Sequence, residues 1–159
     1  MASDTIAGLV EVSREESTLV LEAGYIYMDM GNWKAAQEVF QGAAALFPKS
    51  EVPYLALGTL EFAQGKHDKA LQAYRSAQRL APKAGLPRAH CGEALLWMGK
   101  VPEAEKELKA AIELDPSGDG ASLARALLAA KEEGVLPPPK KGAAKPAAKP
   151  AAPAAKPKK

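Results

Sequence analysis

The sequence predicts an all-α repeat fold, a solenoid of three helical hairpins with a C-terminal capping helix and a basic tail. First, prolines recur every 34 residues, at Pro48, Pro82 and Pro116, in the phrases ALFPKS, RLAPKA and ELDPSG. Second, small and apolar residues recur at fixed places between these prolines. Third, the last 23 residues contain only proline, alanine, lysine and one glycine. A fixed period of this length is typical of stacked supersecondary units, and the final segment cannot build a core.

The register follows when each proline is counted as position 32, which defines repeats 17–50, 51–84 and 85–118. Positions 8, 20 and 27 then hold only small residues, and position 24 holds a large one. In repeat order these are Gly24, Gly58, Gly92; Ala36, Ala70, Ala104; Ala43, Ala77, Ala111; and Phe40, Tyr74, Leu108. Small residues let two helices approach closely while the large residue fills the space between them.

Each repeat is predicted to form two helices, because apolar residues recur at three- and four-residue steps on both sides of a central glycine. These glycines, at position 15, suit the left-handed residue that ends a helix; they are Gly31, Gly65 and Gly99. Ser13 and Glu16 form a capping box before the first repeat. Pro53 and Pro87 suit the first turns of the later leading helices.

The ends of the chain fall outside the repeats. Residues 1–16 form an N-terminal segment in which residues 4–12 are expected to make a short helix. Residues 119–136 are expected to form the capping helix, with Leu123, Leu127 and Leu128 on one face. Residues 137–159 hold seven prolines, eight alanines and seven lysines, and this composition predicts disorder with a reach of roughly 70 Å, at about 3.1 Å per residue in extended polyproline II.

The repeat residues resemble those of the tetratricopeptide-repeat (TPR) family, which has small residues at positions 8, 20 and 27, an aromatic near 24 and proline at 32. The resemblance spans residues 17–118. It implies a right-handed superhelix that binds another polypeptide in a concave groove lined by the leading helices. Positions 2, 5, 9, 12 and 13 supply the expected partner-binding residues, which are Leu21, Tyr25, Met28, Val52, Leu55, Thr59, Phe62, Leu86, Ala89, Glu93, Leu96 and Trp97.

This groove is mostly apolar, which suits an extended or helical apolar segment of another protein. For any single residue, packing against the neighbouring hairpin is the alternative. TPR proteins that capture a C-terminal carboxylate have lysine at position 5 and asparagine at position 9. Position 5 here holds Leu21, Leu55 and Ala89. A carboxylate ligand is therefore not expected.

The small size, the apolar groove and the phrase PRAHCGEALLWMGKVPEAEKEL also resemble the small TPR chaperones of bacterial type III secretion systems. That resemblance implies a chaperone that holds a segment of a secreted subunit before export. The oligomeric state is not fixed by the sequence, and a homodimer stays open.

Catalysis is not expected, because the sequence lacks a phosphate-binding loop, a metalloprotease motif and a nucleophile elbow. His67 and His90 lie in different repeats, and His67 is expected to be an ordinary helix-start residue. The single cysteine, Cys91, excludes an internal disulfide and is expected to be a small core residue. We expect no cofactor and no metal site.

Charge divides the chain into an acidic body and a basic tail. The tail carries Lys140, Lys141, Lys145, Lys149, Lys156, Lys158 and Lys159, whereas residues 1–136 hold 14 of the 21 basic residues and all 19 acidic ones. The tail is either a solubilising extension or an arm for weak, non-specific contact with nucleic acid or an anionic surface. That arm would localise a TPR scaffold, which is the alternative function. No signal peptide or membrane span is expected, and cytoplasmic localisation follows as the default.

Overall fold

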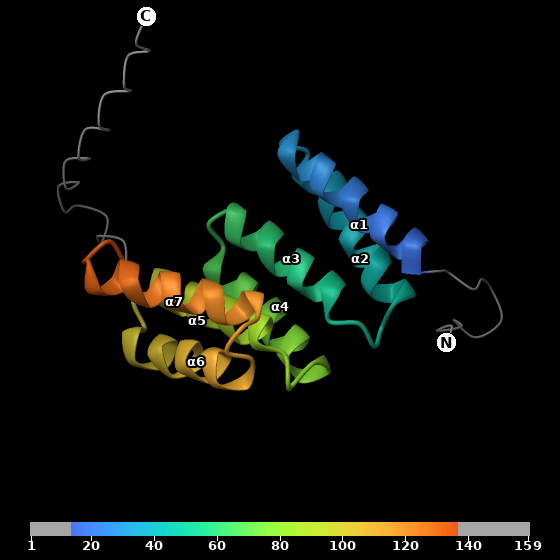
Figure 1. Cartoon of the computed structure of the whole chain (residues 1–159). Helices are drawn as coiled ribbons and strands as arrows, with labels where there is room; N and C mark the ends of the chain where they lie inside the picture. The colour runs from blue at the N-terminus through green and yellow to red at the C-terminus, as the bar shows by residue number, and fades with distance from the viewer. Residues whose placement is uncertain (1–13, 137–159) are drawn as a thin grey trace, which may run out of the picture.

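The computed structural model describes residues 14–136, with side chains from Ser17 onward, and this range contains seven α-helices and no β-strand (Figure 1). The helices are α1 (Arg14–Asp29), α2 (Trp33–Leu46), α3 (Val52–Ala63), α4 (His67–Leu80), α5 (Gly85–Trp97), α6 (Val101–Leu114) and α7 (Asp119–Glu132). The first six pair into three hairpins, and α7 follows as a single helix. The predicted all-α hairpin solenoid is confirmed. The expected helix at 4–12, Ser13 of the capping box and the tail 137–159 lie outside the described residues.

The turn inside each hairpin depends on the predicted glycine. Gly31, Gly65 and Gly99 have φ angles of 72°, 73° and 74°, a left-handed conformation that side chains with a Cβ atom rarely adopt. Asn32 caps α2, because its Oδ1 accepts a hydrogen bond from the backbone N–H of Ala35 at 3.3 Å. Pro53 lies in the first turn of α3, as predicted. Local sequence therefore fixes where the hairpins turn.

Within a hairpin, the residue at position 24 covers the glycine at position 8. A Cβ atom added at Gly24 would lie 2.2 Å from the Phe40 ring, and one added at Gly92 would lie 2.6 Å from the Leu108 side chain. These distances are shorter than any tolerated contact, so the large side chain occupies the space that glycine leaves.

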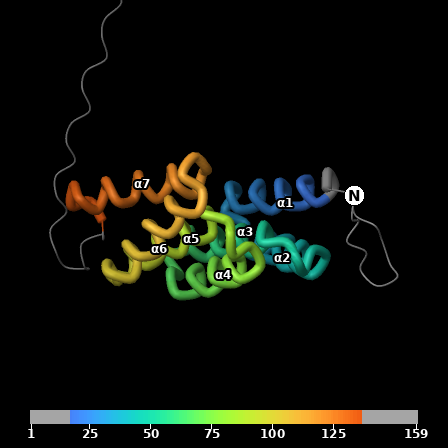
Figure 2. The backbone as a smooth tube through the Cα atoms, turned by 60° about the horizontal axis from the view of Figure 1, so that its bottom comes forward, coloured from blue at the N-terminus to red at the C-terminus, as the bar shows by residue number. Residues whose placement is uncertain are grey.

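Successive hairpins pack through their neighbouring helices: α2 contacts α3, α4 contacts α5, and α6 contacts α7. In Figure 2, α1 and α7 lie along one side of the molecule, and α2, α4 and α6 lie along the other. The leading helix α5 also contacts α7 extensively, whereas α1 and α3 touch at few points. The α5–α7 contact is close, since a Cβ atom at Gly120 would lie 2.3 Å from the carbonyl carbon of Gly85.

A polar cluster joins the second hairpin to the third. The Glu107 carboxylate of α6 accepts hydrogen bonds from Arg75 of α4 and from Arg88 of α5, the latter at 3.1 Å. The Glu107 side chain is only 12% exposed, so these charge-assisted bonds satisfy a carboxylate that is largely removed from water. Three helices are thereby held by one side chain.

Candidate functional site

The predicted partner-binding residues lie on α1, α3 and α5, and we call the surface formed by the exposed and half-buried side chains of these helices the leading-helix face. Three of the predicted residues are exposed, namely Tyr25, Val52 and Trp97, at 37%, 42% and 40%. Seven are half-buried, and they are Leu21, Met28, Leu55, Thr59, Phe62, Leu86 and Glu93. The ten residues come from all three leading helices.

The half-buried apolar members of this face also support the core. Leu21 and Met28 pack against the cluster that contains Phe40 and Leu60. Leu55 and Phe62 pack against a second cluster, which contains Tyr74, Cys91 and Ala94. Their exposed edges belong to the face and their buried edges hold adjacent hairpins together. Substitution of these residues therefore affects both packing and the surface.

Two of the predicted residues do not belong to the surface. Ala89 and Leu96 are fully buried in a cluster that includes Leu127 of α7, so neither predicted partner-binding residue has an exposed side chain in this structure. The reason is the packing of α7 on α5, which the close approach of Gly120 to Gly85 allows. The capping helix thus covers the part of α5 that a further repeat would otherwise cover.

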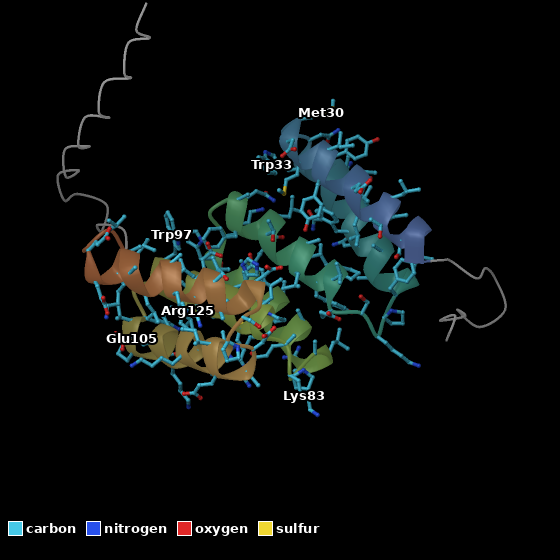
Figure 3. The ribbon with its side chains drawn as sticks, viewed as in Figure 1. Met30, Trp33, Lys83, Trp97, Glu105 and Arg125 are labelled. Carbon is cyan, nitrogen blue, oxygen red and sulfur yellow. The ribbon has the colours of Figure 1, made fainter. Side chains whose placement is uncertain are left out.

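An aromatic cluster bridges the second and third hairpins. The ring centroids of Phe62 and Trp97 lie 5.7 Å apart in an edge-on arrangement, and the His67 ring lies 4.8 Å from Phe62 and 5.4 Å from Trp97. His67 begins α4, as predicted, but the sequence does not predict the contacts of its ring with Phe62 and Trp97. Figure 3 shows Met30, Trp33 and Trp97 near the turns within hairpins, and Lys83 at the opposite edge, in a loop between hairpins.

Polar groups on the face cluster around position 9. Glu93 Oε2 lies 3.0 Å from His90 Nδ1, and the His90 ring stacks on Tyr74 with centroids 4.9 Å apart. Thr59 Oγ1 donates a hydrogen bond to the carbonyl oxygen of Leu55 at 3.0 Å. Burial raises the pKa of Tyr74, so its hydroxyl stays protonated. The sequence indicated Thr59 and Glu93 but not the histidine that pairs with Glu93.

Large exposed apolar side chains are concentrated on the leading helices. On α1, α3, α5 and the turn after α1 they are Leu19, Tyr25, Ile26, Tyr27, Met30, Val52 and Trp97. The trailing helices α2, α4 and α6 contribute only Trp33, Leu80 and Leu114. Five of the seven belong to α1 and the turn after it, and α3 and α5 contribute Val52 and Trp97. Exposed apolar side chains that gather on one part of a surface mark sites of interaction with other molecules.

The described residues offer no arrangement for metal binding, since no group of three or more histidine, cysteine, aspartate or glutamate side chains converges within 14–136. Cys91 is fully buried, and burial raises the pKa of its thiol to about 12. The expected core role of Cys91 is confirmed. In the same part of the chain, no helix has the length and apolar character needed to cross a bilayer.

Two sequence models described as tetratricopeptide repeat match the chain, one at residues 21–85 and the other at residues 61–131. Together they extend across all three hairpins and most of α7. A comparison with curated proteins gave no significant match.

Several solved structures share the fold. The type III secretion translocator chaperone SycD of Yersinia enterocolitica is 26% identical, with a TM-score of 0.68 over 80% of this chain and 99% of SycD. SycD in complex with a peptide of the translocator YopD is 25% identical, with a TM-score of 0.62 over 77% of this chain and 99% of that SycD chain. PcrH of Pseudomonas aeruginosa is 24% identical, with a TM-score of 0.67 over 82% of this chain and 99% of PcrH. This match shows that the two proteins share a fold.

Proposed function

Since this chain is a tetratricopeptide-repeat protein that resembles type III secretion chaperones, we propose that it binds an apolar segment of another protein on the leading-helix face. In this role it acts as a chaperone or adaptor and catalyses no reaction. The bound segment is extended or helical, and its apolar side chains are shielded from water while it is held.

One observation carries this proposal: the large exposed apolar side chains gather on the leading helices. Val52 and Trp97 remain 42% and 40% exposed, although nearby positions on the same helices are fully buried. A complex is stabilised by roughly 25 cal/mol for each Å² of apolar surface that the partner removes from water. The exposed face therefore favours an apolar ligand.

The SycD complex supports the finer proposal. SycD, which shares the fold at 25% identity, is seen with a peptide of the translocator YopD. By analogy, the present chain would hold a segment of a secreted protein before export. The residues at position 5, including Leu21 and Leu55, are apolar, which argues against capture of a C-terminal carboxylate and agrees with an apolar ligand.

Purification of the full chain from its native cells, followed by mass spectrometry, tests this proposal. We expect one dominant polypeptide in stoichiometric amount, bound stably at high salt because apolar contacts are not screened. Copurified nucleic acid, released as salt is raised, would instead indicate the alternative function, a TPR scaffold localised by its tail. That alternative rests on the seven tail lysines and stays a prediction.

A further inference from the structure

The leading-helix face is acidic as well as apolar. Among the described side chains of α1, α3 and α5, the acids are Glu22, Asp29, Glu61 and Glu93, and the single lysine or arginine is Arg88. Arg88 is paired with Glu107 of α6, so its charge is already compensated. Glu61 is paired with Lys66, and Glu93 lies 3.0 Å from His90, so Glu22 and Asp29 are the two acids without an ion pair among the described residues of these helices. The trailing helices carry six lysines and arginines, which are Lys34, Lys69, Arg75, Arg79, Lys106 and Lys109. Basic side chains thus avoid one face of the array.

The tail has the complementary chemistry. Residues 137–159 combine seven lysines with eight alanines and seven prolines, and contain no acid. Small apolar side chains interspersed with lysines match a surface of apolar side chains interspersed with carboxylates. Proline also keeps a segment extended before it binds, which lowers the entropy cost of binding.

The described chain ends at the third hairpin, after α7. Leu136, the last described residue, packs against the cluster that contains Leu95 and Leu96 of α5. Its backbone N–H also donates a hydrogen bond to the Ala130 carbonyl oxygen at 3.3 Å. Figure 1 shows the end of α7 on the side of the molecule where α5 ends. The described chain therefore ends against the cluster that α5 and α7 share.

The tail is long enough to cross the whole face. Helices pack at axial distances of about 8–10 Å, so the three steps from α7 to α1 span about 30 Å. An extended segment of 23 residues reaches roughly 70 Å at about 3.1 Å per residue. Length does not prevent the tail from reaching Asp29 on α1.

We propose that the tail, residues 137–159, docks on the leading-helix face of its own chain and occupies the surface that the partner uses. Its lysines lie near Glu93 and Asp29, and its alanines and prolines cover Val52 and Trp97. This inference rests on the proposed function, because it assigns a competitor to the same face. A tethered segment has an effective concentration near 1 mM, so even an intrinsic dissociation constant of about 1 mM leaves half of the molecules closed. A partner must displace the tail, which keeps the apolar face covered until a tighter ligand arrives.

A spin label in the tail tests this proposal in the full chain. The variant Ala152→Cys provides the attachment site, because the buried Cys91 thiol stays protonated and unreactive. Nuclear magnetic resonance then measures which amide signals lose intensity. We expect losses at residues 52–63 and 86–97 and around Asp29, and recovery of these signals at about 1 M salt, where the screening length is about 3 Å.

Two matched variants sharpen the result. Replacement of the seven tail lysines by glutamine should restore the signals, and Asp29→Asn combined with Glu93→Gln should restore them in part, because each removes one side of the charge pairing. Losses confined to Val135 and Leu136, or spread over α2, α4 and α6, would overturn the proposal. Losses seen only when labelled and isotope-enriched chains are mixed would assign the tail to a second copy and overturn docking in the same chain. If the tail does not dock but the partner still binds the leading-helix face, the proposed function stands.

Discussion

The ring of Tyr74 lies directly over Gly58, so that a Cβ atom added at Gly58 would come within 2.3 Å of the ring. Gly58→Ala must therefore displace Tyr74, which is 1% exposed and stacked on His90. We expect the substitution to lower the free energy of unfolding by about 1–3 kcal/mol, the usual cost of overpacking a core. Thermal and urea unfolding measure this change.

Gly42→Ala is the matched control, because Gly42 lies within α2 and an added Cβ atom there meets no atom within 4 Å. Alanine is the better helix former by about 1 kcal/mol, so this variant should be more stable than the parent. Equal effects of the two substitutions would contradict the packing of Tyr74 on Gly58.

Glu107→Ala removes the carboxylate that holds Arg75 and Arg88. Because both arginines are partly exposed and can regain water, we expect a loss of about 1–2 kcal/mol. Glu113→Ala, at an exposed position of the same helix, should change stability by less than about 0.5 kcal/mol. Denaturant unfolding of both variants decides between a structural anchor and an ordinary surface charge.

Cys91 predicts a pH dependence of stability. Its thiol has a pKa raised by burial from an ordinary value near 9 to about 12, so the unfolded chain releases this proton first. The stabilising contribution is complete below pH 9 and is lost as the pH rises from about 9 toward 12. Unfolding curves over this window should show a steeper decline for the parent than for Cys91→Ala. A thiol reagent that modified the folded protein as fast as the unfolded one would contradict the burial.

The tail lysines predict a salt-sensitive contact if the alternative function holds. Affinity for DNA or anionic vesicles should then fall steeply with added salt and disappear when the chain is shortened at Pro137. Equal binding by the full and shortened chains, measured by fluorescence anisotropy, would exclude the tail as the contact.

The hairpins could be predicted from sequence because their determinants are local and periodic. The glycines at position 15 and pairs such as Gly58 and Tyr74 lie within one repeat, so spacing alone indicates their roles. The burial of Ala89 and Leu96 depends on how closely α7 approaches α5. That distance is set by contact between distant segments, which the 34-residue pattern does not encode.

The sequence also does not predict which side chains of different repeats are in contact. His67 occupies a helix-start position, and the contact of its ring with Trp97 arises only when two hairpins stack. The pairing of Glu107 with Arg75 likewise crosses between hairpins. The spacing of these residues in a single sequence does not indicate that their side chains are in contact. The partner-binding roles of residues on the leading-helix face stay a prediction, because the chemistry of a surface does not identify the molecule that binds to it.

The central claim is that the partner binds the leading-helix face. Substitution of Leu55 or Phe62 would not test this claim cleanly, because both side chains also support the core. Val52→Ser with Trp97→Ser removes two of the exposed apolar side chains from the leading helices. Because Trp97 also contacts Phe62 and His67, the stability of this variant is measured separately from its affinity. Leu80→Ser with Leu114→Ser removes side chains of similar exposure, 37% and 41%, from the trailing helices.

Calorimetry with the copurified polypeptide compares the two double variants at fixed salt, after melting curves establish that each is folded. The loss of Val52 and Trp97 should weaken binding by about 2 kcal/mol or more, about 30-fold in dissociation constant, as expected when large apolar side chains are buried in an interface. The loss of Leu80 and Leu114 should leave the affinity unchanged. Unchanged affinity in the first variant, with a loss in the second, would place the partner on the trailing helices and contradict the proposed function.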